Sequence, residues 1–153
     1  MDVRKPASGG HNIVVTRVIA APRELVWLAW TDPLQTAKWF CPRECAVTEY
    51  HADVRLGGGY RVEMVCNGSS HRAFGTYLEI RPVERLVFTH QWHEPDAPET
   101  VVEVEFTEVS GCTRITLRQS GLGSDSSAKG HESGWASAIE HLAASLGSEC
   151  SAG

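Results

Sequence analysis

The chain has 153 residues, 42% of them hydrophobic and 22% charged, which is enough for one globular domain with a sizeable core. Its formal net charge of −5 and the absence of any run of Lys or Arg argue against binding to nucleic acid. No segment approaches the roughly 20 consecutive apolar residues that a membrane-spanning helix requires, and the N-terminus lacks the apolar stretch of a secretory signal, so we expect a cytoplasmic protein.

The predicted elements begin with a strand over residues 12–19, where β-branched residues crowd together. Before it, residues 1–11 are polar and Gly-rich, and we expect them to form a disordered tail. Pro22 suits the first turn of a helix, and the apolar run that follows it ends near Asp32. Asp32 is also suited to cap a second helix over residues 34–40. The sequence therefore predicts two short helices after the first strand.

Alternation of apolar and polar residues then predicts a series of strands. A period of two places one face of each strand in the core and the other nearer solvent. Turn sequences rich in Gly, Pro and Asn separate the segments, so we expect antiparallel neighbours in a meander. The residues predicted to face the core are Tyr60, Val62 and Met64; Phe74, Thr76, Leu78 and Ile80; Leu86, Phe88, His90 and Trp92; Val102, Val104 and Phe106; and Ile115, Leu117 and Gln119.

The last predicted element is a long helix from His131 onward, with residues 121–130 as a loop or a helical lead-in and residues 148–153 as a frayed end. Its apolar residues have helical spacing: Trp135, Ala138, Ile139, Leu142 and Leu146. An apolar helical stripe and an apolar sheet face must pack together, so we predict one α+β domain over residues 12–147, with Trp135 in the interface.

Five cysteines stand at irregular positions without a CxxC motif: Cys41, Cys45, Cys66, Cys112 and Cys150. The cytoplasm keeps thiols reduced, so we expect small buried hydrophobes or exposed thiols and no structural disulfide. A zinc site would need four nitrogen or sulfur ligands at suitable spacing, and none is expected. The glycines at 57–59 precede a strand rather than a helix, which predicts a tight turn and no nucleotide cofactor.

Four blocks of sequence, in order, resemble the heat-shock-protein ATPase activator homologue-like family of the START-like, or SRPBCC, superfamily. The blocks are residues 21–33 with 38–40, residues 58–61, residues 75–89 and residues 131–135. The resemblance implies a helix-grip (START/Bet v-like) fold, in which a curved antiparallel sheet wraps around the C-terminal helix and leaves a cavity between them. It implies little about function, because the superfamily includes lipid carriers, polyketide cyclases, hormone receptors and co-chaperone domains.

Polar residues on the predicted inner face are the candidates for a binding site. Thr76, His90 and Gln119 either satisfy each other within the core or converge on an apolar cavity, as in small-molecule sites. His131 precedes Trp135 by one helical turn, so it either points at the same space or bonds locally. The predicted ligand-binding residues are Tyr60, Met64, Phe74, Thr76, Phe88, His90, Trp92, Gln119, His131 and Trp135.

These features favour a domain that binds a hydrophobic or amphipathic small molecule. One alternative is a polyketide cyclase-like enzyme with His90 and His131 as its acid–base pair. The sequence has no GxSxG nucleophile motif, and we assign no catalytic residue. The other alternative is a co-chaperone-like ATPase activator domain that binds a protein partner through its surface. A cavity of a few hundred cubic ångströms that touches at least two of His90, Gln119 and His131 would favour small-molecule binding.

Overall fold

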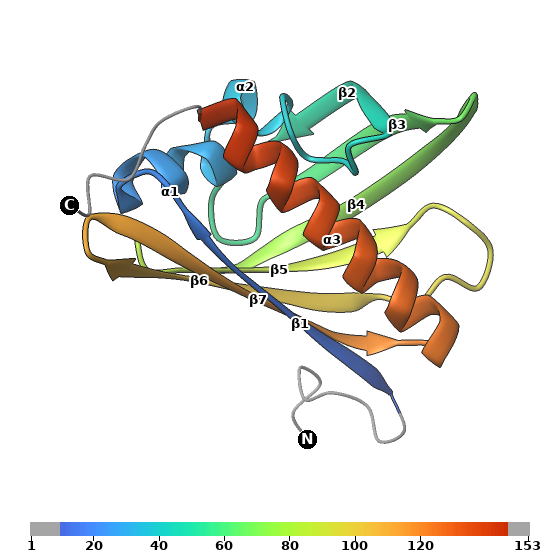
Figure 1. Ribbon diagram of the computed structural model, residues 1–153. Coiled ribbons are helices and arrows are strands. Elements are labelled where there is room, and N and C mark those ends of the chain that lie inside the picture. Colours follow the sequence, from blue (N-terminus) through green and yellow to red (C-terminus); the bar gives the residue numbers. More distant parts are fainter. Residues whose placement is uncertain (1–9, 147–153) are drawn as a thin grey trace.

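One curved sheet and one long helix dominate the computed structural model, which describes residues 10–146 (Figure 1). Within that range the strands are β1 (His11–Ile19), β2 (Cys45–Ala52), β3 (Gly59–Cys66), β4 (Ser69–Arg81), β5 (Arg85–Trp92), β6 (Thr100–Val109) and β7 (Cys112–Leu122). The helices are α1 (Arg23–Thr31), α2 (Pro33–Thr36) and α3 (Asp125–Leu146). The strand order is β1-β7-β6-β5-β4-β3-β2 and neighbouring strands are antiparallel, as predicted.

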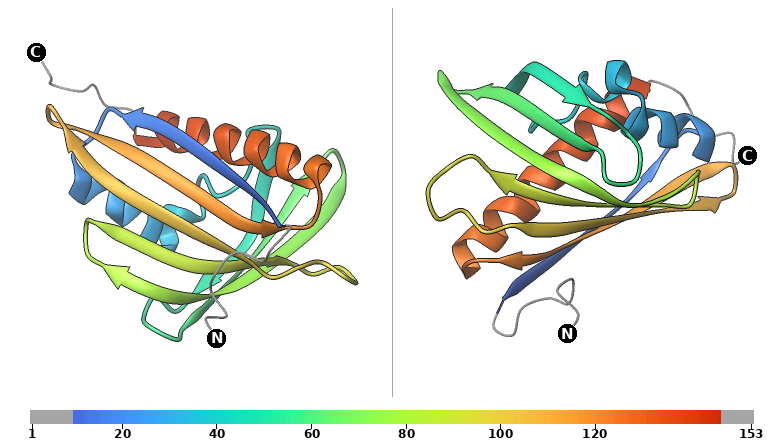
Figure 2. Two further views of the ribbon diagram at one scale, coloured as in Figure 1. Left: turned by 90° about the horizontal axis from the view of Figure 1, so that it is seen from below. Right: turned by 180° about the vertical axis from the view of Figure 1, so that it is seen from behind.

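The three helices lie on the same side of the sheet. Helix α3 runs diagonally across the sheet, and α1 and α2 lie near its C-terminal end (Figures 1 and 2). Helix α3 contacts β1 and β7 directly, whereas α1 contacts β6 and β7 and α2 contacts β2. The sheet therefore curves around α3, and both the helix-grip arrangement and the two short helices after β1 are confirmed.

The core fills the space between α3 and the concave face of the sheet. Trp135 and Leu142 on α3 are buried, as their helical spacing predicted. The Trp135 ring stacks on Trp30 of α1, with ring centroids 6.2 Å apart. The Trp39 Nε1–H group donates a hydrogen bond of 2.9 Å to the Ala29 carbonyl oxygen, which holds the segment after α2 against α1.

Helices α2 and α3 differ in length from the prediction. The Asp32 side chain caps α2 by accepting a hydrogen bond of 3.1 Å from the Leu34 backbone N–H, as expected, but the helix ends at Thr36. Helix α3 begins at Asp125, so of the two alternatives predicted for residues 121–130 the helical lead-in is correct from Asp125 onward. The Ser124 hydroxyl supplies its cap, because it accepts a 3.0 Å hydrogen bond from the backbone N–H three residues later.

The predicted inner face of β4 is wrong over residues 73–77 but correct at Ile80, which packs against the core beyond a register shift between Tyr77 and Glu79. Ala73, Gly75 and Tyr77 are buried, whereas Phe74 is 41% exposed and Thr76 is also exposed. Gly75 is required where the sheet is crowded: a Cβ atom there would lie 1.8 Å from the carbonyl oxygen of Thr89 on β5. Ala73 and Gly75 thus take inner positions, and the bulky Phe74 lies on the outer face. Alternation of apolar residues alone therefore predicted the wrong inner face for this part of the strand.

Strand β2 was not predicted, and with it a disulfide was missed. Cys45 of β2 and Cys66 of β3 are directly opposite each other in the antiparallel register, with Cα atoms 4.4 Å apart, and they are disulfide-bonded. Cys112 is also disulfide-bonded, while Cys41 is a free, buried cysteine. The expectation of no structural disulfide is therefore wrong, because cross-strand pairing cannot be read from spacing when one of the two strands is unrecognised.

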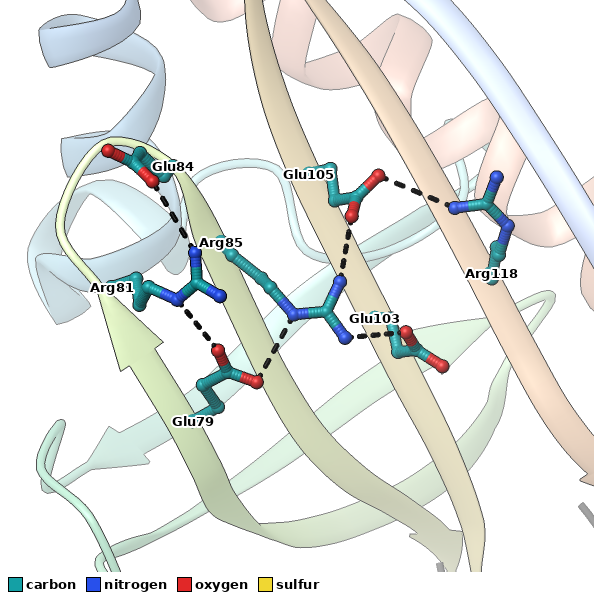
Figure 3. Close-up of polar contacts among 7 residues, drawn as sticks. All are labelled: Glu79, Arg81, Glu84, Arg85, Glu103, Glu105 and Arg118. Carbon is teal, nitrogen blue, oxygen red and sulfur yellow. Dashed lines mark hydrogen bonds and ion pairs between the residues drawn. The ribbon is translucent and has the colours of Figure 1, made fainter. Parts of the chain in front are cut away.

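Charged residues cover the outer face of β4, β5 and β6 (Figure 3). The Arg85 guanidinium lies 3.1 Å from Glu79, 2.7 Å from Glu103 and 2.8 Å from Glu105, and so joins three neighbouring strands. Burial alone would raise the pKa of the Glu79 carboxyl, but hydrogen bonds from Arg85 and Arg81 lower it. This network gives the outer face a structural role, consistent with the polar positions of the strand alternation.

The two ends of the predicted domain are only partly covered by the described residues. Strand β1 begins at His11, so the predicted tail over residues 1–11 is too long by at least that residue, and residues 1–9 lie outside the description. The predicted frayed end at residues 148–153 also lies outside it. No helix within residues 10–146 combines the length and apolar character needed to cross a bilayer.

Candidate functional site

A pocket of about 360 Å³, the inner pocket, lies between the N-terminal half of α3 and the sheet. Its lining is almost entirely apolar or aromatic, with a few imidazole and sulfur groups. The sheet contributes Met64, Cys66, His71, His90 and Trp92; the segment before β2 contributes Phe40, Cys41 and Pro42; and α3 contributes Ser127, Gly130, His131, Gly134, Trp135 and Ala138. This volume is near the lower end of the range for ligand sites.

A second pocket of about 450 Å³, the vestibule, adjoins the inner pocket. The two share five lining residues: His71, His90, Trp92, Ser127 and His131. Beyond these, the vestibule is lined mainly by the loop between β5 and β6, including Glu94 and Asp96, together with Thr100 and Leu122. The vestibule is thus the more polar of the two adjoining spaces, and the inner pocket is the more apolar one.

His131 and Trp92 form the boundary between the two pockets. The Trp92 Nε1–H group donates a 2.9 Å hydrogen bond to His131 Nε2. On the other side of the ring, His131 Nδ1 lies 2.8 Å from the Ser127 carbonyl oxygen. Because an indole can only donate and a carbonyl can only accept, the imidazole proton is on Nδ1. Both nitrogens of His131 are therefore occupied, and the ring links β5 to the first turns of α3.

His90 is only 4% exposed and lines both pockets from β5. Its Nδ1 atom lies 2.5 Å from the Tyr60 hydroxyl, which is also 3.2 Å from the Thr89 carbonyl oxygen. No hydrogen bond reaches Nε2 of His90 from any described residue. Burial lowers the pKa of His90 to about 3, and the nearby His131 adds to this effect. The ring is therefore a neutral polar group on an apolar wall.

Gln119 belongs to the core and not to either pocket. Its side chain has no exposed surface, and its Oε1 atom accepts a 2.8 Å hydrogen bond from Trp135 Nε1–H. Its Nε2 group donates to the Thr100 hydroxyl at 2.9 Å, and that hydroxyl donates to the His90 carbonyl oxygen at 2.6 Å. This chain of hydrogen bonds holds the Trp135 ring and the end of β5 in place, so Gln119 supports the pocket walls without contacting a ligand.

The predicted site residues separate into three groups. Met64, His90, Trp92, His131 and Trp135 line the inner pocket together. Tyr60, Phe88 and Gln119 lie in the core, and the first two border a much smaller cavity of about 10 Å³. Phe74 and Thr76 are on the outer face of β4, so their assignment to the site is wrong.

Several lining residues were not predicted, above all those before β2 and on the first turns of α3. Gly130 and Gly134 are one helical turn apart on α3, a spacing that becomes visible once the helix is begun at Asp125. A Cβ atom at Gly130 would meet nothing within 4 Å, and at Gly134 it would lie 3.9 Å from Pro42. Burial raises the pKa of the Cys41 thiol, which therefore lines the pocket in its neutral form.

A metal site is not formed by the described residues. Within residues 10–146, no group of three or more His, Cys, Asp or Glu side chains is arranged to hold a metal ion, although three imidazoles line the inner pocket. The chemistry that the walls offer is burial of apolar and aromatic surface, with hydrogen bonding from a small number of neutral groups.

A curved antiparallel sheet that encloses a C-terminal helix over an apolar pocket defines a helix-grip domain of the START-like, or SRPBCC, type. A sequence profile described as activator of Hsp90 ATPase homolog 1-like protein matches residues 20–147, and the chain belongs to this family. No curated protein sequence matches the chain.

Solved structures resemble the whole domain. A protein from Chromobacterium violaceum is 30% identical, with a TM-score of 0.80 over 90% of this chain and 98% of that one. An activator-homologue protein from Silicibacter pomeroyi is 27% identical, with a TM-score of 0.78 over 89% of this chain and 97% of that one. DynU16, a protein of the dynemicin biosynthetic locus, is 26% identical, with a TM-score of 0.74 over 88% of this chain and 46% of that one.

Proposed function

We propose that this protein binds a hydrophobic or amphipathic small molecule in the inner pocket. The observation that carries the proposal is the pocket of about 360 Å³ with an almost wholly apolar lining and a neutral, buried imidazole in its wall. Burial of aromatic surface against Phe40, Trp92 and Trp135 would supply most of the binding free energy. The vestibule would hold any more polar part of the ligand.

The glycines of α3 support this proposal. Glycine in a helix interior costs roughly 1 kcal/mol relative to alanine, so two such residues destabilise α3. Gly130 and Gly134 both line the inner pocket; Gly130 is exposed, whereas Gly134 is half-buried and a Cβ atom there would lie 3.9 Å from Pro42 of the same lining. Their effect is to keep open a space that a well-packed core would fill. A binding site accounts for this cost, whereas a purely structural interior does not.

Two alternatives from the sequence have less support in the site. For the cyclase-like enzyme, both nitrogens of His131 are hydrogen-bonded and the lowered pKa of His90 makes its ring a weak base, so the two rings are poorly suited to act as an acid–base pair near neutral pH. The alternative of a protein partner bound through the surface is supported by the family description alone. The cytoplasmic location is a separate prediction.

Native mass spectrometry of the protein purified from the organism that encodes it tests the proposal. We expect a bound small molecule that is lost on denaturation. Gly134→Leu should remove it, because the new side chain would fill the inner pocket. Ser133→Leu is the matched control, since Ser133 is exposed on the same helix and lines neither pocket. Unliganded wild-type protein, or equal loading of both variants, would count against the proposal.

A further inference from the structure

The charge and hydrogen-bonding groups of the walls identify the kind of ligand that the site accepts. We infer that the ligand is uncharged, is aromatic in large part, and carries a hydroxyl group that hydrogen-bonds to Nε2 of His90. This inference rests on the proposed function, and it names the chemical class of molecule that would occupy the inner pocket.

The lining of the two pockets disfavours an anionic ligand. None of the described residues that line the inner pocket or the vestibule is Lys or Arg. Glu94 and Asp96, the charged residues of the adjoining vestibule, are acidic and would repel a carboxylate or phosphate. An ionised group without a partner in such surroundings pays a large desolvation cost. Fatty acids, acyl phosphates and other anionic amphiphiles are therefore disfavoured.

The inner pocket also disfavours a cationic ligand. The described lining of the inner pocket contains no Asp or Glu, so an ammonium group there would have no counter-charge. The acidic residues of the vestibule could hold a cation only outside the boundary formed by Trp92 and His131. An uncharged ligand is the one class that occupies the inner space without either penalty.

His90 is the residue that we assign to the hydrogen bond with the ligand. Three imidazoles line the inner pocket: His131 has both ring nitrogens hydrogen-bonded, the half-buried His71 ring has no hydrogen bond to a described residue, and His90 has one, at Nδ1. Of the latter two, His90 is the buried one, so its unpartnered nitrogen has the least access to water. The Nδ1 atom of His90 faces Tyr60 in the core. The other ring nitrogen, Nε2, has no hydrogen bond to a described residue, and His90 lines the inner pocket. Whether the Tyr60 hydroxyl donates to Nδ1 or to the Thr89 carbonyl decides if Nε2 is a donor or an acceptor. A ligand hydroxyl suits both cases because it donates and accepts.

The aromatic walls of the inner pocket favour a ligand of planar shape. Trp92 and Trp135 stand on either side of the His90 ring, with centroid distances of 5.3 Å and 5.8 Å, and Phe40 is 5.6 Å from Trp135. Aromatic walls of this kind favour planar, aromatic partners through edge-to-face and offset contacts. A fused-ring phenol satisfies the shape, the absence of charge and the hydrogen bond together.

Isothermal titration calorimetry at pH 7 with 2-naphthol and 2-naphthoate tests the inference. The two probes share a ring system, but only the second is ionised. We expect 2-naphthol to bind and 2-naphthoate to bind at least about tenfold more weakly, because of its unpaired charge. Equal affinity for the two probes would overturn the inference and leave the proposed pocket standing. Failure of both to bind would overturn the inference and the proposed function alike.

A pair of variants tests the role of His90. His90→Leu should weaken 2-naphthol binding about fivefold, the loss expected for one hydrogen bond. His51→Leu is the control, because His51 is exposed on β2 and lines neither pocket, so the affinity of this variant should stay near that of wild type. Unchanged affinity in a folded His90→Leu variant would overturn the assigned contact. The comparison of the two probes uses the unaltered protein and does not depend on the stability of any variant.

Discussion

His90 combines two properties that rarely occur together in one histidine: it is almost fully buried, and one of its ring nitrogens has no partner among the described residues. Its surroundings are the aromatic rings of Tyr60, Trp92 and Trp135. Such an environment strongly disfavours the imidazolium form, which explains the pKa of about 3. At neutral pH the ring therefore acts as a hydrogen-bonding group and not as a charge.

This depressed pKa predicts an acid-sensitive stability. The unfolded chain takes up a proton at His90 near the ordinary pKa of 6.5, whereas the folded chain does so only near 3. The contribution of His90 to the free energy of unfolding is thus present above pH 6.5 and is lost as the pH falls toward 3. The loss is at most about 1.4 kcal/mol for each pH unit.

We therefore expect His90→Phe to show a shallower decline of unfolding free energy between pH 7 and pH 5 than the wild type, as measured by urea denaturation. His71→Phe serves as the reference, because the folded environment of His71 is partly solvated. Identical slopes for wild type and His90→Phe would mean that His90 titrates normally in the folded protein.

Removal of the Trp135 side chain should cost a large part of the stability of the fold. Its ring is 7% exposed, stacks on Trp30 and donates a hydrogen bond to Gln119. Trp135→Ala should lower the free energy of unfolding by about 3–5 kcal/mol, because it opens a cavity and leaves the side-chain Oε1 atom of Gln119 without its donor. Trp27→Ala, at a half-buried ring on α1, should cost less. A melting temperature unchanged in Trp135→Ala would contradict this account of the helix–sheet interface.

At the scale of the elements, alternation predicted the inner faces of β3, β5, β6 and β7 correctly, since each buries its larger apolar residues. It failed for β4, where the inner positions hold Ala73 and Gly75 because Tyr60 and the β5 backbone approach closely. It missed β2 altogether. That strand is at the edge of the sheet and is largely exposed, so its sequence lacks a strong apolar face.

The Cys45–Cys66 disulfide ties this edge strand to β3, and it predicts a redox effect on stability. The bond closes a loop with a sequence separation of 21 residues, for which the loss of unfolded-state entropy amounts to roughly 3 kcal/mol. The double variant Cys45→Ala with Cys66→Ala should melt at a lower temperature than oxidised wild type by a corresponding amount. The variant avoids the second effect that a reductant would have at Cys112. Equal melting temperatures would show that the bond does not stabilise the fold.

At the scale of the whole molecule, the sequence predicted that a pocket should exist but not what would form most of its walls. The aromatic residues of β5 and α3 were assigned correctly, because regular spacing predicts the face on which they lie. Phe40, Pro42 and Gly134 could not be assigned in the same way. Their contribution depends on where the chain after α2 passes over α3, a tertiary arrangement that no local pattern encodes.

The measurement that tests the central claim most directly is an NMR titration of the tryptophan indole N–H signals with 2-naphthol. The chain has five tryptophans, and Trp92 and Trp135 line the inner pocket, whereas Trp27 packs against Phe106 at the other end of the sheet interface. Signals can be assigned by single Trp→Phe variants. We predict large, saturable shifts for Trp92 and Trp135 and little change for Trp27. Unchanged signals for Trp92 and Trp135, or a larger response at Trp27, would contradict a ligand site beneath α3.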